Sequence, residues 1–162
     1  MGSGAHTGDE EFDTYFRTVY WSIVRALGTA YGDVEAAEEA TRNAFRRAYV
    51  RWPRVRRNDS PVAWIRRAAI RYLDDDADRP CVTEPGAIEP GSRRSVSSEV
   101  ERALASLSVP ARTALVLTYL EELPQVEVAR SMGISEAAVR AHLDRGLRSV
   151  AAAMGSGEGT DR

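Results

Sequence analysis

A stretch of about twenty residues without helical or strand periodicity divides the sequence into two blocks. Residues 79–98 contain three prolines, two glycines and five serines or threonines, a composition typical of linkers. On either side of it, apolar residues recur at helical spacing, and the β-branched clusters and hairpin dipeptides of a sheet protein are lacking. The chain is therefore predicted to be all-α, with two small helical domains joined by a flexible linker.

Domain boundaries follow from this division. We expect domains over residues 9–76 and 99–154, a linker over residues 77–98, and disordered tails over residues 1–8 and 155–162. A chain of 162 residues with 43% hydrophobic residues can bury a core. Since the sequence has neither an apolar run long enough to cross a bilayer nor a signal-peptide pattern, we expect a cytoplasmic protein without membrane contact of its own.

Three helices are predicted in the first block. The first is expected to stop at Gly28, the second to run from a cap at Asp33 to Pro53, and the third to begin at Ser60-Pro61. The apolar rows that define them are Phe12, Phe16, Val19, Ile23 and Leu27, then Ala37, Thr41, Ala44, Phe45, Ala48 and Trp52, then Trp64, Ile65, Ala68, Ala69 and Tyr72.

Four helices are predicted in the second block. A capping box, Ser98 with Glu101, opens the first of them. Pro110 and Pro124 open the next two, and Ser135 caps the last, which is expected to run to about Met154. The residues expected to be buried in the first two are Val100, Ala103, Leu104, Leu107, Ala114, Leu115, Leu117 and Leu120.

Residues 124–145 fit a helix-turn-helix motif. Ala129 is small where the two helices must approach closely, Gly133 can take the left-handed conformation of the turn, and Ser135 caps the second helix. The small core that holds the two helices of the motif together is predicted to be Val126, Val128, Ile134, Val139 and Leu143. The expected DNA contacts on the recognition helix are Ser135, Glu136, Ala138, Arg140, Ala141, His142 and Arg145. The alternative is a helical hairpin whose small residues serve packing alone.

The charges are segregated along the chain. All 22 basic residues are arginines, and residues 42–71 carry a net charge of +9, between residues 1–41 at −6 and residues 74–90 at −5. A strongly basic segment of this length indicates a surface for a polyanion or an acidic protein, or else a solvated arginine-rich helix face. The acidic residues 74–90 either mask the basic segment by folding back on it or serve as a solubilising spacer.

Both blocks resemble one protein family. Residues 103–150, which contain the helix-turn-helix motif, resemble the −35-reading domain (region 4) of extracytoplasmic-function sigma factors, and residues 33–71 look like region 2 of the same family. The resemblance is closest to compact two-domain members from actinobacteria. It implies promoter DNA and the RNA polymerase core as partners, and an anti-sigma factor as a possible third.

The resemblance also implies roles for residues of the first block. Region 2 binds the polymerase core and opens the −10 element, and the core-binding pattern falls on residues 39–45. The residues that would contact the polymerase are Glu38, Glu39, Arg42, Phe45 and Arg46. Those that would engage the −10 DNA are Trp52, Arg54, Arg56, Arg57, Asn58, Trp64, Arg67 and Arg71. The loop over residues 54–59 corresponds to the one that captures a flipped base.

Nothing in the sequence indicates an enzyme. His6 and His142 lack partners at metal-binding spacing, Cys81 has no histidine nearby in sequence, and no phosphate-binding loop is present. We therefore expect no catalytic residues, no metal and no cofactor. The tryptophans and tyrosines of the first block are expected mainly in the core, with Trp52 the one most suited to face nucleic acid.

Two other functions remain open at this point. One is a helix-turn-helix repressor or activator, with the first block as a dimerisation or sensor module; response-regulator output domains share much of the motif. The other is a sigma-like adaptor that binds protein without opening promoters, because Arg71 stands where the family has Asn and Asp74, Asp75 and Asp76 replace its basic tail.

Overall fold

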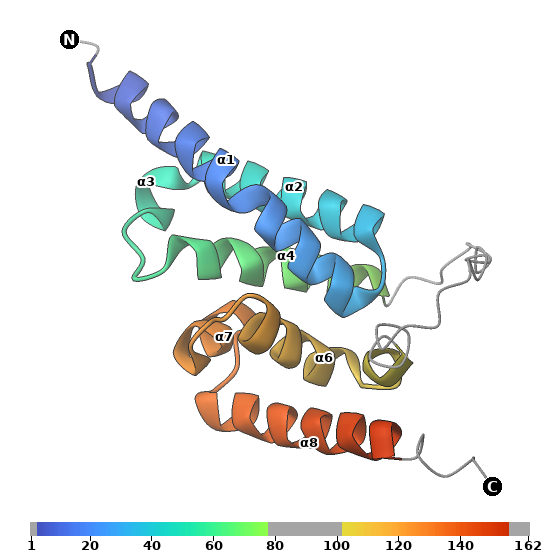
Figure 1. Cartoon of the computed structure of the whole chain (residues 1–162). Coiled ribbons are helices and arrows are strands. Elements are labelled where there is room, and N and C mark those ends of the chain that lie inside the picture. The colour runs from blue at the N-terminus through green and yellow to red at the C-terminus, as the bar shows by residue number, and fades with distance from the viewer. Residues whose placement is uncertain (1–2, 78–101, 156–162) are drawn as a thin grey trace, which may run out of the picture.

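The protein is built from two layers of helices. The computed structural model describes residues 3–77 and 102–155, with side chains for residues 8–76 and 102–155. One layer holds α1 (Ser3–Tyr31), α2 (Val34–Val50), the short α3 (Trp52–Val55) and α4 (Pro61–Ala77). The other holds helical residues 102–105, α6 (Val109–Leu115), the π-helical turn η1 (Val116–Leu120), α7 (Gln125–Met132) and α8 (Glu136–Gly155). Figure 1 shows the two layers stacked. The described residues contain no strand, and the predicted all-α class is confirmed.

Local signals fix most helix starts. The backbone N–H of Ala36 donates to the Asp33 carboxylate at 2.9 Å, and that of Ala63 donates to the Ser60 hydroxyl at 3.2 Å. Both predicted caps are therefore present, and each satisfies a backbone donor that would otherwise lack a partner at the helix end.

The predicted limits of α1 were wrong at both ends. The helix begins at Ser3, inside the segment expected to be a disordered tail, and it continues through Gly28 to Tyr31. Gly32, with φ of +76°, takes the left-handed conformation instead. Gly28 has a packing role, because a Cβ atom there would lie 3.1 Å from Cγ2 of Val34 at the start of α2.

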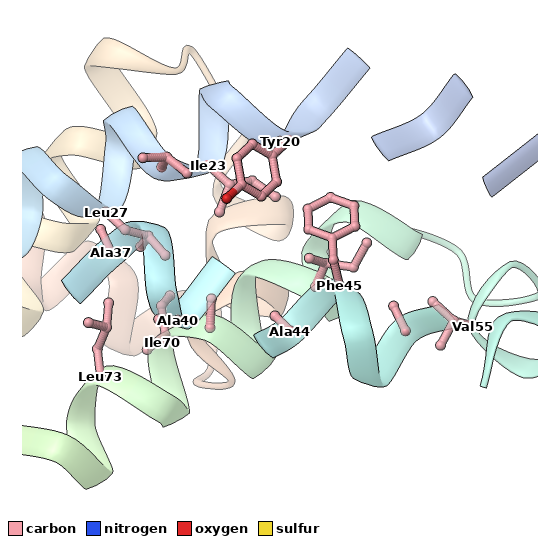
Figure 2. Close-up of a cluster of buried hydrophobic side chains, with 14 of the residues drawn as sticks. Tyr20, Ile23, Leu27, Ala37, Ala40, Ala44, Phe45, Val55, Ile70 and Leu73 are labelled. Carbon is pink, nitrogen blue, oxygen red and sulfur yellow. The ribbon is translucent and has the colours of Figure 1, made fainter. Parts of the chain in front are cut away.

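The core of the first layer is rich in aromatic rings. The predicted rows of α1 and α2 converge on Phe45, which is 2% exposed and lies edge-on to Phe16 with ring centroids 4.8 Å apart. Figure 2 shows Phe45 beside Tyr20, with the small residues of α2 between α1 and α4. Alanines at positions 37, 40, 44 and 48 of α2 are fully buried, which allows the neighbouring helices to approach α2 closely.

The core of the second layer departs from the predicted pattern after Leu117. Leu117 is buried as expected, but Leu120 is 53% exposed. The helix widens to a π-helical turn over η1, and the changed number of residues per turn takes Leu120 off the 3.6-residue apolar row. Val126, also predicted to be core, lies exposed on the first turn of α7.

The two layers pack directly on each other. α4 packs against α7, and α1 packs against α6 and η1. Ala26 and Ala30 of α1 are buried in the core of the second layer. The sequence predicted two domains separated by a linker and did not predict this packing. The linker itself, the capping box at residues 98–101 and Cys81 lie outside the described residues.

Candidate nucleic-acid interface

The helix-turn-helix has the predicted local geometry. Gly133 ends α7 with φ of +69°, the left-handed conformation that a side chain disfavours. The Ser135 hydroxyl accepts a hydrogen bond from the Ala138 N–H at 3.1 Å and so caps α8. Val128, Ala129 and Val139 are buried between the two helices. The turn therefore directs the N-terminal end of α8 away from the core of the second layer.

Most of the predicted recognition residues are accessible on α8. Five of them are exposed, namely Ser135, Glu136, Arg140, Ala141 and Arg145. Ala138 and His142 are half-buried, and the His142 Nδ1 atom is buried without a hydrogen-bond partner in the part of the chain that the structure describes. Arg140 and Arg145 thus have the freedom to reach DNA, whereas His142 faces partly inward.

An arginine-lined groove lies across α2 and α4. Its volume is about 290 Å³. It is lined by Arg47, Arg51, Trp64, Arg67, Ala68 and Arg71. Four guanidinium groups around one indole offer both phosphate contacts and a stacking surface for a base. The structure brings Trp64, Arg67 and Arg71, three of the residues assigned to the −10 element, into one groove.

Two residues of this groove were missed from the sequence. Arg47 and Arg51 stand four residues apart, a spacing that places them on one face at the end of α2. Arg42 and Arg46, which also stand four residues apart, were assigned to the polymerase contact. That assignment followed the family resemblance and did not consider which face of the helix each arginine occupies.

Trp52 does not face nucleic acid. It is only 5% exposed, and its ring packs against Phe12 at 5.1 Å and Tyr15 at 5.5 Å between centroids. The expectation that Trp52 stacks on DNA was therefore wrong, because the apolar surface of α1 covers the indole. Trp64, half-buried beside the arginines, is the aromatic residue that the groove presents.

The predicted base-capturing loop is partly helical. Arg54 lies within α3, while Arg57 and Asn58 lie in the exposed turn that follows. Arg56 is exposed but donates to the Glu11 carboxylate of α1 at 2.9 Å. Asn58 lines a second, smaller groove of about 220 Å³ together with Trp64, Arg67 and Arg130.

The residues assigned to polymerase binding divide into surface and core. Glu38 and Arg42 form an ion pair at 2.9 Å, and Glu39 accepts a hydrogen bond from the Tyr72 hydroxyl at 3.1 Å. Arg46 is exposed and contacts Asn43. Phe45, in contrast, belongs to the core, so its assignment as a polymerase contact was wrong; its place in the pattern reflects packing.

The acidic end of α4 is partly tied to α1. The Tyr31 hydroxyl donates to the Asp74 carboxylate at 2.7 Å, and burial, followed by this carboxylate, raises the pKa of Tyr31. Asp75 and Asp76 are exposed at the end of α4. The remaining acidic residues of the masking hypothesis lie outside the described range.

The described residues contain neither a membrane-spanning helix nor a metal-binding cluster. Within residues 3–77 and 102–155, no helix combines the length and apolarity needed to cross a bilayer. The same ranges contain no group of three or more His, Cys, Asp or Glu side chains placed to hold a metal ion.

Comparison with known proteins supports both halves of the resemblance. The family Sigma-70, region 4 matches residues 97–150. The RNA polymerase sigma-E factor of Streptomyces coelicolor is 26% identical over 148 residues, which cover 85% of this chain and 82% of that protein. The sigma factor RpoE of Bartonella quintana, solved with the anti-sigma factor NepR, shares the fold with a TM-score of 0.71 at 15% identity, over 94% of this chain and 99% of that one. Residues 97–150 are thus similar to region 4 of the sigma-70 family, and the chain as a whole is similar in sequence and in fold to known sigma factors.

Proposed function

We propose that this protein directs the RNA polymerase core to specific promoters, with residues 9–76 engaging the polymerase and the −10 element and residues 99–154 reading the −35 element. The observation that carries the proposal is the capped helix-turn-helix at Gly133 and Ser135, which lies inside the region 4 match. The arginine groove on α2 and α4 supports the −10 role, because melted DNA presents both phosphates and unstacked bases.

Each half would bind weakly alone. Residues 98–162 carry a net charge of −2, so the recognition helix gains little from long-range attraction to DNA. Binding both halves to one polymerase gives each a high effective concentration at its own promoter element. The protein then acts through placement of the polymerase, in the cytoplasm and without catalytic residues of its own.

A protein inhibitor is part of the proposal. The matched Bartonella sigma factor was solved with an anti-sigma factor, and its fold extends over nearly the whole of this chain. A similar anti-sigma factor would bind this protein and keep it from the polymerase.

Run-off transcription with purified core polymerase on genomic fragments tests the proposal. Initiation that depends on this protein and starts at defined sites is the expected result. Binding to the core without initiation would favour the sigma-like adaptor. A footprint on palindromic half-sites in the absence of polymerase would favour a conventional repressor or activator.

A further inference from the structure

The arginine groove across α2 and α4 carries more positive charge than the −10 assignment uses. The resemblance to sigma factors assigns Trp64, Arg67 and Arg71 of this groove to the −10 element. Arg47 and Arg51 of α2 are not among the residues that the resemblance assigns, yet they line the same groove. They raise the number of guanidinium groups around it from two to four.

The four guanidinium groups of the groove are available to an anion. All four arginines are exposed, and within residues 3–77 and 102–155 none of them has a carboxylate partner or donates a side-chain hydrogen bond. By contrast, Arg42 of α2 pairs with Glu38, and Arg130 of α7 pairs with Glu127. The groove is therefore a local concentration of positive charge that the protein itself does not neutralise.

Helix geometry arranges the groove in two rows. Trp64, Arg67 and Arg71 stand at i, i+3 and i+7 of α4, which places them on one face of that helix. Arg47 and Arg51 stand four residues apart on α2, which packs along α4 (Figure 1). An anion in the groove can therefore be held from both helices, with an indole at the N-terminal end of the α4 row.

The size of the groove suits a single nucleotide. Its volume of about 290 Å³ lies at the lower end of the range for small-molecule sites. Trp64 and Arg67 also border the adjoining groove of about 220 Å³, where Asn58 offers an amide that can both donate and accept. A base stacked on Trp64 can thus reach the Asn58 amide while its phosphates lie among the arginines.

Charge density distinguishes two classes of nucleotide ligand. Single-stranded DNA brings one phosphate charge for each nucleotide. A nucleoside triphosphate carries about four charges on one nucleotide, because its terminal phosphate has nearly two and each of the others has one. Guanidinium groups bind phosphate oxygens through paired hydrogen bonds. Four of them around a space for one nucleotide match the triphosphate better than the strand.

We propose that the arginine groove binds a free nucleoside polyphosphate. The base stacks on Trp64, and the phosphate chain lies between Arg47 and Arg51 on one side and Arg67 and Arg71 on the other. The binding does not depend on the sigma function, but its consequence rests on the proposed function. Because the ligand covers three residues of the −10 surface, the nucleotide and the −10 strand exclude each other, and promoter use responds to the nucleotide concentration.

Isothermal titration of the free full-length protein tests the site. Affinity is expected to rise from AMP through ADP to ATP, because each phosphate adds a charge. ATP is expected to bind more tightly than inorganic tripolyphosphate, because only ATP has a base to stack. Absence of saturation by ATP up to about 1 mM, or equal affinities for AMP and ATP, would overturn the proposal. Equal affinities for ATP and tripolyphosphate would overturn the stacking on Trp64.

Arginine variants locate the phosphate chain. Arg47→Gln and Arg71→Gln each remove one guanidinium, from opposite sides of the groove, and each is expected to weaken ATP binding about fivefold to tenfold. Arg17→Gln is the matched control, because it removes the same charge from an exposed arginine of α1 outside the groove. It should change the affinity by less than about twofold. Equal losses in all three variants would mean that ATP responds to overall charge and would overturn the site.

Tryptophan variants locate the base. Trp64→Leu should lower the affinity for ATP to about that for tripolyphosphate, whereas Trp64→Tyr keeps an aromatic face and should retain most of the difference. Trp64 also packs against the core of the first layer, so helical content from circular dichroism identifies a variant that fails to fold. A folded Trp64→Leu protein that still prefers ATP over tripolyphosphate would contradict the assignment of the base to Trp64.

Competition tests the exclusion of the −10 strand. The probe is a fluorescent single strand from the −10 element of a promoter found by run-off transcription, bound to this protein together with core polymerase. ATP should displace it, and Arg47→Gln should require about fivefold to tenfold more ATP. Displacement that is unchanged in Arg47→Gln would place the effect on the polymerase and overturn the exclusion. If no promoter is found, the sigma function fails, while titration of the free protein still decides whether the groove binds nucleotides.

Discussion

Arg140 is the residue whose role as a base reader is simplest to test. It is exposed on α8, two turns of helix before Arg148, which is also exposed. If Arg140 reads a base, Arg140→Ala should lower affinity for the −35 site by roughly 1–3 kcal/mol and relax discrimination at one position. Binding titrations of the protein on single-substituted −35 duplexes measure both effects.

Arg148→Ala is the matched control, because it removes the same charge farther from the start of the recognition helix. It should weaken binding to all duplexes by similar, small amounts. A uniform loss in Arg140→Ala across every duplex would assign Arg140 to a phosphate contact instead.

Gly133 is constrained by both conformation and space. Its φ is +69°, and the side chain of Arg67 lies against the position that a Cβ atom on residue 133 would occupy. Gly133→Val is expected to destabilise the protein by about 1–3 kcal/mol, because a β-branched residue is strained in the left-handed region. Thermal unfolding measures the loss. Gly155→Val, where a Cβ atom would meet no atom within 4 Å, is the control, and equal melting temperatures for the two variants would contradict this role.

Single residues in the sequence predicted the structure correctly where the interaction is local, as in helix capping. Asp33, Ser60 and Ser135 each cap the helix that directly follows them, so a short stretch of sequence contains both partners. Trp52 and Trp64 show the limit of this reasoning. Both lie among arginines in the sequence, and only the packing of Phe12 and Tyr15 over Trp52 determines which of them is available to a base.

At the scale of elements, Ser60 connects helix capping to the contact between layers. Its hydroxyl accepts from the Ala63 N–H and donates to Glu127, whereas Asp33 caps α2 with no contact across the layers in the described structure. Asp33→Ala should cost about 1 kcal/mol. Ser60→Ala should cost about 2 kcal/mol, because it also removes a hydrogen bond to a charged group.

Urea unfolding of a double-mutant cycle checks this difference. In a Glu127→Ala background, the cost of Ser60→Ala should fall to that of a cap alone, near the value for Asp33→Ala. A cost that is the same in both backgrounds would mean that the hydrogen bond to Glu127 contributes nothing to stability.

The π-helical turn shows why the second layer was predicted less accurately than the first. The prediction that Leu117 and Leu120 share one apolar row assumed 3.6 residues per turn, and the π-helical geometry of η1 departs from that value. It leaves Glu121 with a side chain only 7% exposed against Arg25, and Glu122 follows with φ of +52°. An irregular turn of this kind carries no propensity signal, yet it positions the contact between Glu121 and Arg25 of the other layer.

At the scale of the whole molecule, the contact between layers was not predictable from the sequence. The charged residues that join the layers, such as Arg25 with Glu121 and Arg130 with Asp59, are individually indistinguishable in sequence from solvated surface charges, and their partners are far apart along the chain. The glycine and proline content of the linker correctly predicted that the chain has two helical blocks. It also led us to expect that these blocks are independent domains. That division describes the connectivity, whereas the packing of α4 on α7 depends on shape and charge that only the folded layers present.

Acid should weaken the contact between the two layers through Glu127, which accepts a hydrogen bond from Ser60. Burial raises the pKa of this carboxyl, but hydrogen bonds from Ser60 and Arg130 and the charges of Arg130 and Arg66 outweigh it, so the pKa is lowered overall. Tyr15 of α1 also lies near Glu127, and it stays neutral in acid because burial raises its pKa. The ionised carboxylate therefore stabilises the folded protein above the ordinary carboxyl pKa of about 4.3, and this contribution is lost as the pH falls through the lowered value. The difference in the free energy of unfolding between the wild type and Glu127→Gln, measured by urea unfolding, should be constant from pH 7 to about pH 5 and should narrow below about pH 4.3. A difference that persists unchanged to about pH 3 would show that the charge of Glu127 does not hold the layers together.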